Sequence, residues 1–175
     1  MVRAALARLP PRGRAIVAAL ASLVALQALA SDGSASGTLS YASRGAPITV
    51  ALHYAWLFRG PDAVDAQRTI RRLIFSSSDI RAALAACPSL SCTDAALGSG
   101  MTLDLDNGPR LNYWVSLDHQ RVQYSGSARP DALALTTQTP SRLAGRLTLD
   151  DSAAGGAKVD VSFDTPLVAA LKLAR

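Results

Sequence analysis

The fold is decided by the stretch Ile48-Thr49-Val50-Ala51-Leu52-His53-Tyr54-Ala55-Trp56-Leu57-Phe58. Every second residue from Ile48 onward is β-branched, leucine or aromatic, and the intervening positions are lighter, from Thr49 to Leu57. Alternation of this kind predicts a β-strand whose heavier face lies against a core. Because most later segments repeat the two-residue pattern, we expect this strand to lie near the middle of a β-sheet.

Short alternating segments, separated by turn residues, fill the chain from Gly98 onward. Met101-Leu103-Leu105 and Leu111-Tyr113-Val115 are two of them, joined by a turn at Asn107-Gly108. Such spacing predicts a single, mainly β domain over residues 37–175, built as an antiparallel β-sandwich, with a small β-barrel as the alternative. One short helix is expected near residues 79–86, ending at Cys87-Pro88. The structure of residues 62–72 stays open between an exposed loop and a helical turn.

The first thirty residues have the features of a secretory signal peptide. A basic start is followed by an apolar run of sixteen residues, 15–30, which ends in Ala28-Leu29-Ala30. This order is typical of a cleaved leader, and the run is shorter than the ~20 residues that cross a bilayer. A retained anchor is the alternative. We expect cleavage between Ala30 and Ser31, no membrane span afterwards, a flexible lead-in over residues 31–36 and a periplasmic or secreted protein.

The basic charge of the chain belongs largely to this leader. The formal net charge is +5, and four arginines in residues 1–14 supply four of these charges, which leaves +1 for residues 31–175. The remaining arginines are scattered, and alternation places the adjacent pair Arg71-Arg72 on opposite faces of a strand. A nucleic-acid interface needs basic residues gathered on one surface, so the sequence disfavours a nucleic-acid partner.

The two cysteines, Cys87 and Cys92, are five positions apart. An even number of cysteines in an exported chain favours a disulfide. It would close a small loop around Pro88 and staple the end of the helix to the following segment, a stabilisation of about 2 kcal/mol. The spacing is not the C-x-x-C of a redox pair. Free thiols or a metal site are the alternatives, although the two histidines, His53 and His119, give none of the usual zinc spacings.

No motif identifies a catalytic, cofactor-binding or metal site. The segment Asp104-Leu105-Asp106-Asn107-Gly108 has its glycine too early for a calcium loop and lacks the closing carboxylate, so it predicts a hairpin turn. No G-x-S-x-G elbow is present. Two residues are candidates for a cleft or surface site: His53, which lies between small neighbours on the lighter face of its strand, and Trp114, on the polar face of its strand. A structural histidine and a tryptophan packed under a loop are the alternatives.

Several segments together resemble a family of proteins. They are Leu52-His53-Tyr54-Ala55-Trp56 with the turn Gly60-Pro61-Asp62, then Leu73-Ile74-Phe75-Ser76, and the closing pair Leu143-Ala144-Gly145-Arg146-Leu147 and Val159-Asp160-Val161-Ser162-Phe163-Asp164. The pattern is similar to that of uncharacterised exported bacterial β-sandwich proteins. This resemblance implies a small periplasmic β-sandwich, and it supplies no activity.

Two functions from different classes follow. The first is a non-enzymatic exported β-sandwich that binds or scaffolds an envelope protein or a glycan through its edges or loops. It is favoured because the strands account for nearly all apolar residues and leave no polar cluster unexplained. The alternative is a β-barrel that carries a small apolar ligand, which the leucine-rich faces and Gly145 in mid-strand permit. An enzyme fits the sequence least, and no cofactor is expected.

Overall fold

The computed structural model of the protein describes residues 33–42 and 46–173. The expected cleavage site between Ala30 and Ser31 lies outside these residues. The strands are β1 (Ser34–Tyr41), β2 (Ile48–Pro61), β3 (Thr69–Ser76), β4 (Gly100–Leu105), β5 (Leu111–Leu117), β6 (Gln120–Ala128), β7 (Leu133–Thr139), β8 (Arg142–Asp150) and β9 (Ala157–Ala170). The helices are α1 (Arg81–Ala85) and α2 (Leu90–Ala96), with the 3₁₀ turns η1 (Pro130–Ala132) and η2 (Ser152–Ala154). The prediction of a mainly β chain is therefore confirmed.

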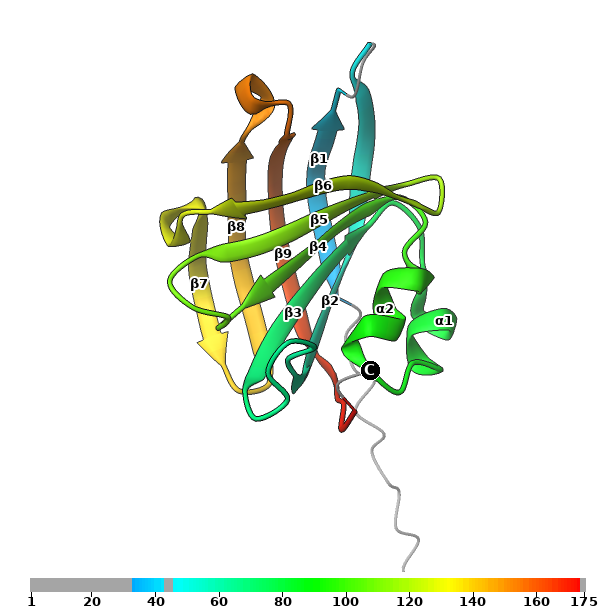
Figure 1. Ribbon diagram of the computed structural model, residues 1–175, viewed down its shortest axis with the longest axis vertical. Helices are drawn as coiled ribbons and strands as arrows, with labels where there is room; N and C mark the ends of the chain where they lie inside the picture. The colour runs from blue at the N-terminus through cyan, green and yellow to red at the C-terminus, as the bar shows by residue number, and fades with distance from the viewer. Residues whose placement is uncertain (1–32, 43–45, 174–175) are drawn as a thin grey trace, which may run out of the picture.

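All nine strands belong to one sheet within the described residues. Their order is β6-β5-β4-β3-β2-β1-β9-β8-β7, and neighbours in this order pair antiparallel. The sheet curls into a half-barrel, so that β4, β5 and β6 cross in front of β7, β8, β9 and β1 (Figure 1). The antiparallel arrangement was predicted, but one continuous sheet takes the place of the two separate sheets of a sandwich.

The first strand lies in the middle of the sheet, between β2 and the last strand. β1 begins at Ser34 and Gly33 is buried, so the lead-in expected over residues 31–36 is too long. A Cβ on Gly33 would lie 1.9 Å from the carbonyl oxygen of Ala55, which explains the need for glycine there. β2 and β9 extend beyond the N-terminal end of β1. There they pair directly with each other as parallel strands, beginning at Leu57 opposite Leu167.

The strand β2 changes which of its faces points inward. Leu52 is fully buried in the inner core, as the alternation predicts, but Ala55 and Leu57 are also in that core, while Trp56 faces outward. Over the same residues the register of the β1–β2 pairing shifts, between the pair Ser34–Tyr54 and the pair Gly37–Leu52. A register irregularity reverses the faces of a strand. The prediction that one set of alternating residues faces one core throughout is therefore wrong beyond Leu52.

The inner core fills the concave side of the half-barrel. Side chains from strands at opposite ends of the sheet meet there, and the rings of Phe75 on β3 and Phe163 on β9 pack edge to face with centroids 5.4 Å apart. Tyr113 on β5 is fully buried, and its hydroxyl bonds to the Asp151 carboxylate after β8. The curl of the sheet is thus fixed by apolar packing across it and by a polar contact at one end.

A second, smaller core lies on the outer face, under the two helices. Trp56, Phe58 and Ile74 of the sheet pack there against Leu84 of α1 and Leu90 of α2. α1 lies inside the range predicted for the helix, residues 79–86, but α2 was not predicted. β2 ends at residue 61 and β3 begins at residue 69, so the segment that the sequence left open is a loop followed by strand.

The reversal of β2 generates a prediction about two positions that strict alternation places on one face. Replacing Leu57, which is fully buried, by alanine is expected to lower the free energy of unfolding by about 2–5 kcal/mol, because a cavity remains in the inner core. Ala51→Thr, at an exposed site of the same strand, is the matched control and should change it by less than about 0.5 kcal/mol. Urea unfolding measures the free energy of unfolding of both variants. Equal changes would contradict the conclusion that β2 reverses its inward face between these positions.

Candidate functional site

The half-barrel is open between its two end strands, β6 and β7. These strands follow one another in the chain, joined by Arg129 and η1, yet they do not pair with each other. β7 is bonded only to β8, so its other edge has no strand partner in the described part of the chain. An edge of this kind presents a row of backbone N–H and C=O groups that can bind another strand.

The sequence of β7 does little to protect this edge. Its residues are Leu133-Ala134-Leu135-Thr136-Thr137-Gln138-Thr139, with no charge and no proline. The devices that usually block edge strands are charged side chains, prolines and bulges. Of these, β7 has only a register irregularity, between Leu135 and Thr137. Its edge is therefore chemically able to accept an added strand.

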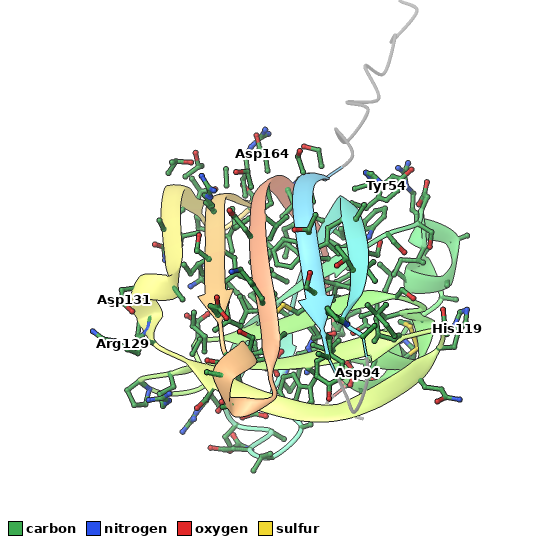
Figure 2. The ribbon with its side chains drawn as sticks, turned by 90° about the horizontal axis from the view of Figure 1, so that it is seen from above. Tyr54, Asp94, His119, Arg129, Asp131 and Asp164 are labelled. Atoms are coloured by element: carbon green, nitrogen blue, oxygen red, sulfur yellow. A yellow bond between two sulfur atoms is a disulfide. The ribbon has the colours of Figure 1, made fainter. Side chains whose placement is uncertain are left out.

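The charged side chains at the two ends of β7 are already paired within the chain. At its start, Arg129 Nη2 lies 3.1 Å from Asp131 Oδ2, and Figure 2 shows both side chains at the corner where the chain turns into β7. Beyond its end, Arg142 Nη2 lies 2.6 Å from Asp164 Oδ2 on β9. The arginines at the two ends of β7 are therefore each compensated by an aspartate.

An apolar cleft of about 240 Å³ lies beside β7. One wall is the inner face of β7, with Leu133 and Leu135, and the other is the hairpin of residues 105–111 between β4 and β5, with Leu105 and Leu111. Pro130 of η1 lies at one end. We call this cleft, together with the free edge of β7, the open seam. Its leucines point inward because each occupies the core-facing position of its strand.

The rim of the open seam is rich in arginine. Arg71 on β3 binds the Asp106 carboxylate with two bonds, Nε to Oδ2 at 2.6 Å and Nη2 to Oδ1 at 2.8 Å. The hydrogen bonds that Arg71 donates to Asp106 raise the pKa of the guanidinium. Arg68 Nη1 donates to Asn107 Oδ1 at 3.1 Å, so two arginines hold the tip of the hairpin. Arg110 donates from Nε and Nη2 to the hydroxyl and carbonyl oxygens of Ser127.

A larger hollow of about 530 Å³ is lined in part by Asp131 and Ala132 of η1 and shares Arg110 with the open seam. Its carboxylates have partners inside the protein. Asp150 Oδ2 lies 3.0 Å from Lys158 Nζ, and Asp151 is bonded to Tyr113. These carboxylates therefore stabilise the ends of strands, and they do not form a cluster that awaits a ligand.

The densest group of charges is buried between β3, β4 and α2. Arg72, 5% exposed, donates from Nε and Nη2 to both oxygens of Asp104, 3% exposed, at 2.6 and 2.8 Å. Its Nη1 donates to the carbonyl of Leu90 at 2.6 Å and to Asp94 at 3.1 Å. Burial raises the pKa of the Asp104 carboxyl above its ordinary value, because the loss of hydration outweighs the bonds from Arg72.

This buried group acts as a structural tie. Arg72 connects β4, through Asp104, to α2, through Leu90 and Asp94. Among the described residues no buried side-chain nitrogen or oxygen lacks a hydrogen-bond partner. A catalytic acid or base needs access to a substrate proton, and this pair is enclosed and fully bonded. We therefore do not assign it a chemical role.

The structure does not bring the two candidate residues from the sequence together. His53 is exposed on β2. Trp114 is half-buried on the outer face of β5, with the Arg72 guanidinium 5.8 Å from its ring centroid. β3 and β4 separate the two strands in the sheet. Cys87 and Cys92 are joined, with Cα atoms 5.3 Å apart, so the predicted disulfide is confirmed.

The residues of the open seam were not predicted as a site. Strand alternation identified Leu105, Leu111 and Leu133 as core positions, but the sequence does not state which strands end the sheet. Within the described residues no three histidine, cysteine or acidic side chains are placed to hold a metal ion. No helix of the described chain has the length and apolar character needed to span a membrane.

Comparisons with known proteins found no match for this chain. No family model, no curated protein and no solved structure is similar to it.

The buried tie predicts a large effect on stability. Arg72→Ala leaves the Asp104 carboxylate buried without its partner, and we expect a loss of about 3–5 kcal/mol in the free energy of unfolding. The double variant Arg72→Met/Asp104→Leu removes both charges and should recover most of this loss. Arg142→Ala removes an equally bidentate but exposed pair and should shift the urea midpoint little. Similar shifts of the urea midpoint for Arg72→Ala and Arg142→Ala would contradict the structural role of Arg72.

The end of β8 predicts a dependence of stability on pH. Hydrogen bonds from Ser152 and Lys158 lower the pKa of Asp150 to about 2, from 3.8. The folded protein therefore holds this carboxylate ionised more strongly than the unfolded chain does, and the resulting stability is present above pH 3.8 and lost as the pH falls through about 2. Asp150→Asn should have a lower thermal midpoint than the wild type near neutral pH, and the difference should vanish in acid. A difference that is independent of pH would contradict this assignment.

Proposed function

We propose that the protein is a non-enzymatic binding module that captures an extended segment of another protein at the open seam. The segment adds as a strand to the free edge of β7, and its inward-facing side chains enter the apolar cleft beside residues 105–111. The observation that carries this proposal is the unpaired, uncharged edge of β7 next to an apolar cleft.

Strand addition explains both parts of the seam. Backbone bonds to an open sheet edge supply affinity, and pockets for alternate side chains supply specificity. β7 offers seven residues for pairing. The leucines of the cleft, from Leu105 to Leu135, offer the pocket for every second side chain of the segment.

The alternative function is the carriage of a small apolar ligand, and the filled interior disfavours it. The concave side of the half-barrel is packed with side chains that have no exposed area, among them Leu73, Phe75 and Tyr113. The cleft beside β7, at about 240 Å³, is also smaller than the 300–1,000 Å³ typical of small-molecule sites. Strand addition needs no enclosed space, so it fits this geometry better.

An exported setting is part of the proposal. The disulfide between Cys87 and Cys92 suits an oxidising compartment, and the leader of residues 1–30 directs the chain there. The partner in this setting is an envelope or secreted protein with an accessible extended segment. A glycan is a less suitable ligand for the seam, because the walls of the cleft are leucine-rich and glycan hydroxyls need polar partners.

A library of random peptides displayed on phage and selected on the purified folded protein tests the proposal. We expect enriched peptides that alternate apolar residues, as extended strands do. Their binding should fall at least about tenfold in the variant Ala134→Lys/Thr136→Lys, because lysines on an edge strand block pairing. Both positions are exposed, so the variant should keep its fold.

The matched control is Thr38→Lys, an exposed position on β1, which is paired on both sides. It should bind the selected peptides as the wild type does. Peptides that bind the β7 variant and the wild type equally would overturn the proposal, and so would the absence of enrichment. Native mass spectrometry that shows a lipid retained by the purified protein would support the carrier function instead.

A further inference from the structure

Two of the three arginines around the open seam have no carboxylate partner among the described residues. Asp106 neutralises Arg71. Arg68 binds the neutral amide oxygen of Asn107, and Arg110 binds only the uncharged groups of Ser127. No carboxylate among the described side chains pairs with Arg68 or Arg110. The rim formed by Arg68, Arg71, Asp106 and Arg110 therefore carries two excess positive charges.

This excess contrasts with the adjoining strands. On β8 and β9 each basic side chain has an acidic partner, in the pairs Arg142–Asp164, Arg146–Asp160 and Lys158–Asp150. The outer face of the sheet is thus electrically balanced beside the seam, while the seam itself is not. Uncompensated charge of one sign favours a ligand of the opposite sign and speeds its encounter with the site.

We propose that the segment captured at the open seam is acidic and alternates apolar residues with aspartate or glutamate. This inference rests on the proposed function and names the chemistry of its partner. In an added strand, successive side chains point to opposite faces. One row enters the cleft between Leu111 and Leu135. The carboxylates of the segment are attracted by the charge of Arg110, which lines the cleft, and of Arg68, which is bonded to the hairpin beside it. A guanidinium without an acidic partner is well suited to bind a carboxylate.

Three synthetic peptides of the length of β7 test the inference: one alternates valine with aspartate, one valine with glutamine and one valine with lysine. Fluorescence anisotropy measures their binding to the full folded protein. At about 0.1 M salt we expect the aspartate peptide to bind at least about fivefold more tightly than the lysine peptide. At about 1 M salt, where the Debye length falls to about 3 Å, the preference should largely disappear.

Variants of the rim provide the second readout. Arg110→Gln should reduce the preference for the aspartate peptide several-fold, and Arg110→Lys should restore part of it. Arg59→Gln removes an exposed arginine of β2 that does not line the seam, so it should leave the preference unchanged. Urea midpoints equal to that of the wild type show that the variants are folded.

The outcomes separate the two proposals. If all three peptides bind equally and the β7 variant Ala134→Lys/Thr136→Lys abolishes binding, strand addition stands and the acidic preference is overturned. A tighter lysine peptide, or a preference that Arg110→Gln leaves intact, overturns the acidic preference as well. If none of the three peptides binds, the acidic preference and strand addition at the seam are both rejected.

Discussion

β2 has to supply side chains to both faces of the sheet, and the rest of the structure depends on how it does so. In the first part of the strand, Val50 and Leu52 pack on the concave side. Further along, Leu57 remains inside while Trp56 and Phe58 face the helices. The change occurs next to Gly33, which lies against Ala55 of β2 and Thr165 of β9. There the Thr165 hydroxyl donates a hydrogen bond to the Ala55 carbonyl at 3.0 Å. Because both faces of β2 are then covered by apolar contacts, the sheet has a core on each side.

The curl of the sheet and the open seam have a common origin. Packing of Phe75 against Phe163 draws β3 toward β9, and the hairpin of residues 105–111 is carried over the inner face of β7. The strands at the two ends then cross at an angle and do not pair, so the barrel is left unclosed. Edges of sheets are usually protected, and the exposed backbone of β7 is the feature that most needs a functional explanation. The strand addition that we propose accounts for this exposed edge and for the apolar cleft beside it.

Local patterns predicted the elements better than their arrangement. Alternation identified the strands around Leu103, Tyr113 and Val161, since each has one apolar and one polar face. The reversal in β2 was not visible, because it depends on pairing with β1. α2 was missed because Ser89-Leu90-Ser91-Cys92-Thr93 has weak helix propensity; its carbonyl at Leu90 is held by Arg72, a contact between distant residues. The seam was missed for the same reason, since strand order is set by long-range pairing.

The position of β1 has a consequence for how the molecule is made. β1 lies between β2 and β9, and it is bonded to β9 along its whole length, from Ser34 opposite Asp164 to Tyr41 opposite Ala157. The middle of the sheet is therefore incomplete until β9 has been synthesised and has paired with β1. Contacts between the two ends of a chain slow folding, because a long loop must close first. The sheet of this protein is therefore expected to form more slowly than one in which each strand pairs only with its neighbours in the chain.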